Sequence, residues 1–257
     1  MSSITSGKSN NRTVVRPWAV AVWLLIWEAA SILIGQEILL VSPVSVVVKL
    51  KSLVFESNFW QTILFSFCRI VAGFLIATLA GTVFAALSAC FRAVEELLAP
   101  VMLTIKATPV ASFIILVLIW VPSRNLSVIT SFLMVLPIIY TNVLIGIRST
   151  DPKLLEMAEL FRVPLSRKII YIYLSQVMPY FQTACSVGLG MCWKAGVAAE
   201  VIGIPTGSIG EKLYKAKIYL ETPDLFAWTL VIIVISILFE RFFLLLLLRV
   251  VRRLERM

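Results

Sequence analysis

The sequence contains no histidine and little charge for its length. Its 257 residues include four cysteines, 14 acidic and 23 basic side chains. Without histidine, the chain can form no imidazole-ligated zinc site and has no imidazole base for catalysis. The cysteines, which are Cys68, Cys90, Cys185 and Cys192, lie in or beside apolar runs without metal-ligand spacing. We therefore interpret them as small packing residues and expect neither a metal nor a cofactor in this chain.

Apolar residues dominate what is present. They make up 60% of the chain, and the mean hydropathy is +0.98, whereas soluble domains are about 45–50% apolar. The composition therefore predicts an integral membrane protein. A net charge of +9 might otherwise suggest nucleic-acid binding, but in a membrane protein it is typical of cytoplasmic loops.

Six apolar runs are long enough to cross a bilayer, which requires about 20 residues. They cover residues 17–34, 60–87, 100–120, 126–147, 176–201 and 225–248. We expect an all-α fold with six transmembrane helices, in which Pro109, Pro137 and Pro179 are tolerated inside spans. Residues 17–248 would form a single domain between cytoplasmic tails at 1–16 and 249–257.

Lys and Arg are distributed unevenly between the segments that connect these runs. With both termini placed inside, the inner segments carry fourteen of them and the outer segments six. The excess of positive charge predicts that both termini and the segment 148–179 are cytoplasmic.

The segment 148–179 is a polar island between the fourth and fifth runs. Asp151-Pro152 is typical of a helix start, because Asp caps free N–H groups and Pro fits the first helical position. Apolar and charged residues then alternate at helical spacing, and Pro164 predicts a stop near Val163. Such a short amphipathic helix cannot span the bilayer, but it can lie on its surface or enter a groove on a soluble partner.

The island resembles the EAA loop of binding-protein-dependent ABC transporter permeases. Glu156, Ala158, Ile172 and Leu174 match that motif in register, whereas Met157, Arg162 and Ser175 depart from it. Four further segments are similar to the nitrate/sulfonate/taurine-type permeases: residues 39–45, 66–74, 146–152 and 193–200.

The resemblance implies the permease subunit of an importer in the bacterial plasma (inner) membrane. The island would be the coupling helix that docks on ATP-binding cassette subunits, which would bind ATP and Mg. A second permease copy and an extracytoplasmic binding protein would complete the transporter. The coupling residues would be Leu155, Glu156, Ala158, Glu159, Phe161, Arg162, Val163 and Pro164.

Arg162 stands where the family motif has Gly. A Gly there would end the coupling helix in a left-handed conformation, which costs Arg about 1 kcal/mol. Either the turn differs, or Arg162 is retained to meet an acidic groove on the ATPase. We predict the different turn, with Pro164 ending the helix.

Ionisable residues inside apolar runs must face the bundle interior or pair, because exposing them to lipid is costly. We predict an ion pair between Glu28 and Arg69, with Lys194 as the alternative partner. It would be either structural or part of the substrate path. The resemblance implies a pathway lined by the fifth span, which makes Trp193 and Lys194 candidate path residues.

The fifth run also carries small residues four positions apart: Ala184, Gly188, Cys192 and Gly196. Such a face allows close helix packing, either inside one subunit or against a second permease copy.

Two other classes of protein compete with the importer. A self-sufficient channel or secondary transporter would need no ATPase, and internal repeats would be expected in the transporter. A membrane-embedded lipid-modifying enzyme is disfavoured by the lack of histidine and of a Gly-x-Ser-x-Gly elbow. The substrate remains open among small anions and organic solutes such as nitrate, sulfonates, taurine and thiamine-precursor pyrimidines.

Overall fold

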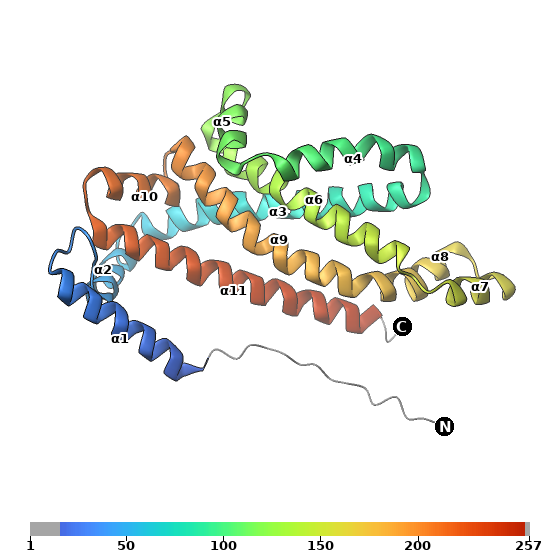
Figure 1. Cartoon of the computed structure of the whole chain (residues 1–257), viewed down its shortest axis with the longest axis horizontal. Coiled ribbons are helices and arrows are strands. Elements are labelled where there is room, and N and C mark those ends of the chain that lie inside the picture. The colour runs from blue at the N-terminus through green and yellow to red at the C-terminus, as the bar shows by residue number, and fades with distance from the viewer. Residues whose placement is uncertain (1–15, 255–257) are drawn as a thin grey trace.

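The computed structural model describes residues 16–254, with side chains up to residue 249, and this part of the chain is almost wholly helical (Figure 1). No β-strand occurs within it. A 3-10 turn at Ser123–Asn125 precedes α6, and a π-helical turn at Ile169–Tyr173 joins α8 to α9. The helices are α1 (Pro17–Ile34), α2 (Pro43–Val54), α3 (Phe59–Cys90), α4 (Arg92–Ala107), α5 (Val110–Trp120), α6 (Leu126–Arg148), α7 (Pro152–Leu160), α8 (Leu165–Lys168), α9 (Leu174–Gly203), α10 (Ile209–Ile218) and α11 (Thr222–Leu254).

Five helical segments are long and apolar enough to cross a membrane. They contain α1, α3, α6, α9 and α11. The helices α4 and α5 make a sixth span only if they are counted together, because they meet at a bend of 111°. The chain is thus an all-helical integral membrane protein with five or six candidate spans.

The third predicted run is a broken helix. α4 ends at Ala107 and α5 begins at Val110, with Thr108 in an extended conformation at φ −78° and ψ 127°. Pro109 forces this break, because a residue before proline avoids the helical region and proline itself offers no N–H. Pro109 therefore lies at the break between α4 and α5, whereas Pro137 and Pro179 lie inside helices.

The core lies where α3, α6 and α9 pack together. Phe74, Ile139 and Leu189, one from each helix, are almost completely buried there. Glycine brings α3 close to α6, since a Cβ on Gly73 would lie 2.4 Å from the carbonyl oxygen of Val128. In contrast, α11 exposes large apolar side chains such as Ile237 and Leu238, as expected of a surface that faces lipid.

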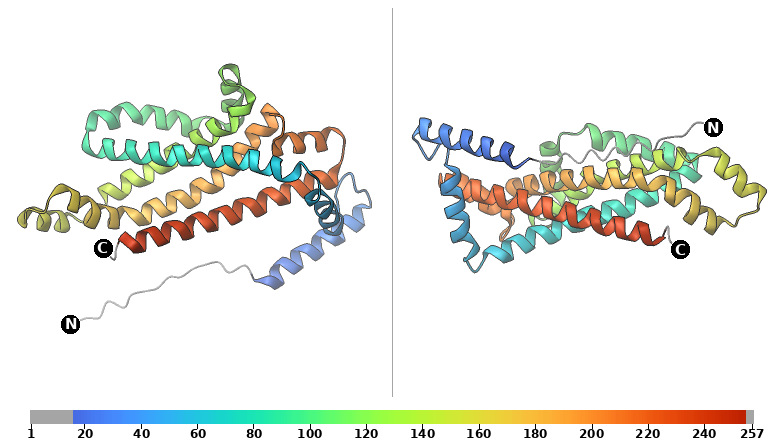
Figure 2. Two further views of the ribbon diagram at one scale, coloured as in Figure 1. Left: turned by 180° about the vertical axis from the view of Figure 1, so that it is seen from behind. Right: turned by 90° about the horizontal axis from the view of Figure 1, so that it is seen from below.

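The polar connections gather at the two ends of the bundle (Figures 1 and 2). α7 and α8 lie at one end, which we call the α7 end, and α2 and α10 lie at the opposite α10 end. The apolar-run analysis missed α2 and α10, although both have sequence signals for a helix start. Ser42 precedes Pro43 and caps α2, and the side chain of Ser208 caps α10.

The close approach of α3 and α6 gives a direct test of this packing. Gly73→Ala should lower the melting temperature of the detergent-solubilised protein, because its new methyl group collides with the backbone and overpacking costs about 1–3 kcal/mol. Gly190→Ala is the matched control: no atom lies within 4 Å of its added Cβ. Equal melting temperatures for the two variants would contradict this account of the core.

Candidate functional site

The helix α7 begins where the sequence predicted and is fixed at both of its ends. The Asp151 carboxylate accepts a hydrogen bond from the Lys153 N–H at 2.9 Å, and Pro152 occupies the first turn. At the other end, the N–H of Val163 donates to the carbonyl of Ala158 and that of Arg162 donates to Glu159, both at 2.9 Å. These paired bonds form a Schellman motif, which requires a left-handed residue after the helix.

Arg162 is that left-handed residue, with φ +50°. The prediction of a different turn at this position is wrong. Arg162 keeps the conformation that the family motif assigns to Gly, at a cost of about 1 kcal/mol. The helix consequently ends at Leu160, and Pro164 follows the turn instead of making it.

The exposed face of α7 differs from the predicted one. Ala158 is 1% exposed and packs inside the chain, so the prediction that it enters a partner's groove is wrong. Leu155 and Val163 are half-buried, while Pro164 and the charged residues Glu156, Glu159 and Arg162 are exposed. The apolar side chains that α7 leaves open are Met157, Leu160 and Phe161, at 49%, 81% and 72% exposure.

The predicted Glu28–Arg69 ion pair is also wrong. Arg69 donates from Nε to the carbonyl of Arg124 at 2.6 Å, and its guanidinium lies over the Phe65 ring at 3.6 Å. Within residues 16–249, Glu28 and Lys194 take part in no ion pair. Arg69 instead ties α3 to the turn that precedes α6, because a backbone carbonyl can satisfy the guanidinium as a carboxylate would.

The two candidate path residues point in different directions. Trp193 is 3% exposed and its ring lies 6.0 Å from that of Phe67, so in this structure it is a core residue. Lys194 is exposed on the open side of α9, together with Thr183, Val187 and Gly190.

The stripe of small residues on α9 faces the inside of the subunit. Ala184 and Cys192 have no exposed surface. A Cβ on Gly188 would lie 3.2 Å from Val135, and one on Gly196 would lie 2.6 Å from Ile70. In this structure the stripe therefore packs within the subunit, against Val135 of α6 and Ile70 of α3.

A buried carboxylate at the α10 end was missed from the sequence. Glu200 has no exposed surface, and its Oε2 accepts hydrogen bonds from Ser66 Oγ at 2.7 Å and from the Gly210 N–H at 3.2 Å. The Ile209 N–H donates in turn to Ser66 Oγ at 2.9 Å. The available signal was a glutamate at the end of an apolar run, where an unpaired charge is costly.

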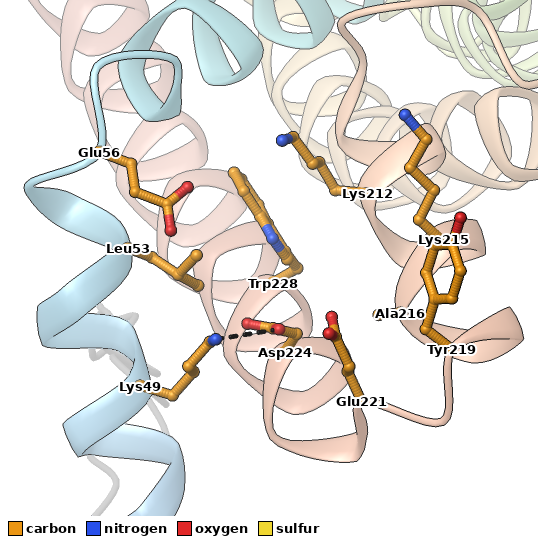
Figure 3. Close-up of a pocket in the computed structure, with 10 residues that line it drawn as sticks. All are labelled: Lys49, Leu53, Glu56, Lys212, Lys215, Ala216, Tyr219, Glu221, Asp224 and Trp228. Carbon is orange, nitrogen blue, oxygen red and sulfur yellow. Dashed lines mark ion pairs between the residues drawn. The ribbon is translucent and has the colours of Figure 1, made fainter.

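A hollow of about 360 Å³ also lies at the α10 end, between α2, α10 and α11 (Figure 3). Its lining carries both signs of charge, including Lys212, Lys215 and the ion pair of Lys49 with Asp224 at 3.1 Å. Burial alone would raise the pKa of Glu211 nearby. Hydrogen bonds from Lys215 and from the Gly207 N–H outweigh it, so the pKa of Glu211 is lowered.

No group of three His, Cys, Asp or Glu side chains that could hold a metal occurs in the part of the chain that the structure describes. Three features remain as candidates for a functional site: the exposed hairpin of α7 and α8, Lys194 on α9, and the α10 end with buried Glu200 and the hollow.

Residues 70–256 match the family model described as binding-protein-dependent transport system inner membrane component. The chain belongs to this family of permeases. A relative from Bacillus subtilis (strain 168), named as an aliphatic sulfonates transport permease protein, is 25% identical over 86% of the permease and 81% of its own length.

Two further relatives support the same subfamily. The taurine transport system permease protein TauC of Escherichia coli (strain K12) is 23% identical over 86% of the permease and 81% of its own length. The nitrate import permease protein NrtB of Synechococcus elongatus is 23% identical over 76% and 73%. The permease is thus an ABC transporter permease of the nitrate/sulfonate/taurine family, and the relatives are named as transport subunits, not as enzymes.

The turn after α7 yields a prediction on stability. Arg162→Gly should raise the melting temperature and slow amide exchange in residues 153–163, because glycine adopts a positive φ without the strain of about 1 kcal/mol. The control substitution Arg167→Gly should lower stability instead, because Arg167 lies in the right-handed helix α8. Destabilisation by Arg162→Gly would show that the Arg162 side chain contributes more than its backbone costs.

Proposed function

We propose that the permease forms half of the pore of an ATP-driven importer and that α7 docks on the ATPase. The observation that carries this proposal is the open patch of Met157, Leu160 and Phe161 on a helix at the end of the bundle (Figure 1). Nine residues are too few to cross a bilayer, so the patch is available to a soluble partner.

The patch has the spacing of a helix that binds in a groove. Positions i, i+3 and i+4 share one face, and amphipathic helices use such apolar anchors to enter a partner's groove. Glu156, Glu159 and Arg162 flank the patch and are exposed, which suits polar contacts at the rim of an interface.

The remaining parts of the proposal concern the complete transporter. Two ATPase subunits would bind ATP and Mg and move the α7 hairpins of two permease copies, most simply a homodimer. This would switch the pore between its two sides by rigid-body motion. The distribution of Lys and Arg supports a cytoplasmic α7 end with both termini inside a bacterial inner membrane. The α10 end would then receive an extracytoplasmic binding protein that delivers the solute.

The open side of α9 is the best candidate for the path. A lysine facing lipid is costly, and the open side of α9 exposes Thr183 and Gly190 with one apolar residue, Val187, whereas α11 exposes mainly large apolar side chains. A cation here suits a small anion, or an organic solute with an anionic group, of the kinds that the relatives' names indicate. We assign Lys194 and not Trp193 to the path.

The docking patch can be tested by introducing a negative charge into it. Leu160→Asp should prevent co-purification of the ATPase that is expressed with the permease and abolish ATP-driven uptake, because the groove would have to bury an unpaired charge. Phe55→Asp is a matched control for association with the ATPase, since Phe55 has the same exposure of 81% but lies at the α10 end.

The result separates the importer from its rivals. If Leu160→Asp left both association and uptake at the parental level, α7 would not be the coupling element. If the purified parent moved solute without any ATPase, a channel or secondary transporter would replace the importer.

The path can be tested with cysteine reactivity in a variant that lacks the four native cysteines. Single cysteines at Val187, Gly190 and Lys194 should react in proteoliposomes with charged methanethiosulfonates, which need a water-exposed thiolate. Cysteines at Leu79 and Leu238, which are exposed on α3 and α11, should remain unmodified in lipid. Equal reactivity of the two groups would remove α9 from the path.

A further inference from the structure

Glu200 joins three helices that are distant in sequence. Its carboxylate extends from α9 to Ser66 on α3 and to the first turn of α10, and the Ile209 N–H completes the network by donating to Ser66. We call Ser66, Glu200, Ile209 and Gly210 the Glu200 cluster. Hydrogen bonds to a fully buried carboxylate are among the stronger ones in proteins, so the cluster holds α10 firmly on the bundle.

Steric contact reinforces these hydrogen bonds. A Cβ on Gly210 would lie 2.3 Å from Glu200 Cβ and 2.4 Å from its carbonyl carbon. The first turn of α10 therefore rests directly on the last turn of α9. Any larger residue at position 210 would force the two helices apart.

The carboxyl group of Glu200 lies beside the start of α10, where a helix carries a partial positive charge. The Gly210 N–H donates to Glu200 Oε2, whereas Glu200 Oε1 has no hydrogen-bond partner among the described residues. Arg69, one turn from Ser66 on α3, holds the carbonyl of Arg124. Neighbouring turns of α3 thus fix both connections at the α10 end, one before α6 and one after α9.

The helix that this cluster holds forms a ridge between two hollows. Lys212 and Lys215 line the hollow of Figure 3 and also a second one of about 400 Å³, bounded by Asn58, Gln61 and Thr206. Lys215 pairs with Glu211 at 2.6 Å, while Lys212 has no acidic partner within residues 16–249. Lys212 is therefore an unpaired cation on this ridge, although Glu56, Glu221 and Asp224 line the same hollow.

We propose that Glu200 is a positioning residue that orients α10 so that its lysines meet carboxylates on the protein that delivers the solute. This inference rests on the proposed function and names the surface and the charge of that partner. Glu200 is fully buried and touches no partner; it acts through α10. If it acted only as a structural support, its loss would weaken the whole permease instead of one contact.

The experiment compares two Ser–Glu pairs in the complex of permease and ATPase. Glu200→Ala and Ser66→Ala break the cluster, and Glu200→Gln keeps an acceptor oxygen for Ser66 and Gly210. Glu240→Ala is the matched control, because Ser186 donates to Glu240 at 2.7 Å across α9 and α11. Two quantities are measured: the rate of tryptic cleavage after Lys212, Lys215 and Lys217, and the Kd for the binding protein expressed with the transporter.

Glu200→Ala should speed cleavage in α10 and raise the Kd on the order of tenfold, which corresponds to about 1.4 kcal/mol. ATPase co-purification should stay intact, Glu200→Gln should retain most of the affinity, and Lys212→Glu should raise the Kd without speeding cleavage. Parental cleavage and Kd in Glu200→Ala, or the same changes in Glu240→Ala, would overturn the inference.

Two further outcomes remain decisive. If Glu200→Ala does not fold, then Ser66→Ala and Glu200→Gln decide through the same measurements. If the parent complex recruits an ATPase but its Kd for the binding protein does not change in Lys212→Glu, the inference fails while the importer stands.

Discussion

The fold depends on the close approach of α3, α6 and α9. Lipid removes the usual hydrophobic drive between helices, so association depends on packing, on hydrogen bonds and on residues small enough to let backbones meet. Gly73, Gly188 and Gly196 supply the close contacts, and Ser131 Oγ donates to the Cys192 carbonyl at 3.1 Å across α6 and α9. This buried interface holds α9 in place, and with it the hairpin at one end and α10 at the other.

The same helix therefore connects two regions of opposite character. At the α7 end, the hairpin leaves Met157, Leu160 and Phe161 open and accepts a strained residue at Arg162. At the α10 end, Glu200 and Gly210 leave no space between α9 and its neighbour. A hairpin with an exposed apolar patch suits an element that another protein moves, whereas a tightly packed end suits a surface that must keep its shape.

The sequence predicted what depends on composition and on local signals. Five of the six apolar runs coincide with long helices, whereas the third covers the break between α4 and α5. Asp151-Pro152 located the start of α7, because helix starts, like apolar runs, rest on properties of consecutive residues. Partners across the bundle could not be predicted in this way. The rotation of each helix about its axis decides whether Trp193 faces the core. It also decides which backbone carbonyl Arg69 reaches. Glu28 and Arg69 were paired because both are ionisable residues inside apolar runs, and that argument ignores direction around the helix axis.

The π-helical turn at Ile169–Tyr173 determines the direction in which the α7–α8 hairpin leaves α9, measured around the axis of α9. Such a turn accommodates one residue more than an α-helix would in the same place. Each residue of an α-helix advances the chain by about 100° around its axis. The additional residue therefore decides on which side of α9 the hairpin emerges. In an otherwise similar chain that is one residue shorter here, the hairpin would emerge on a different side of α9.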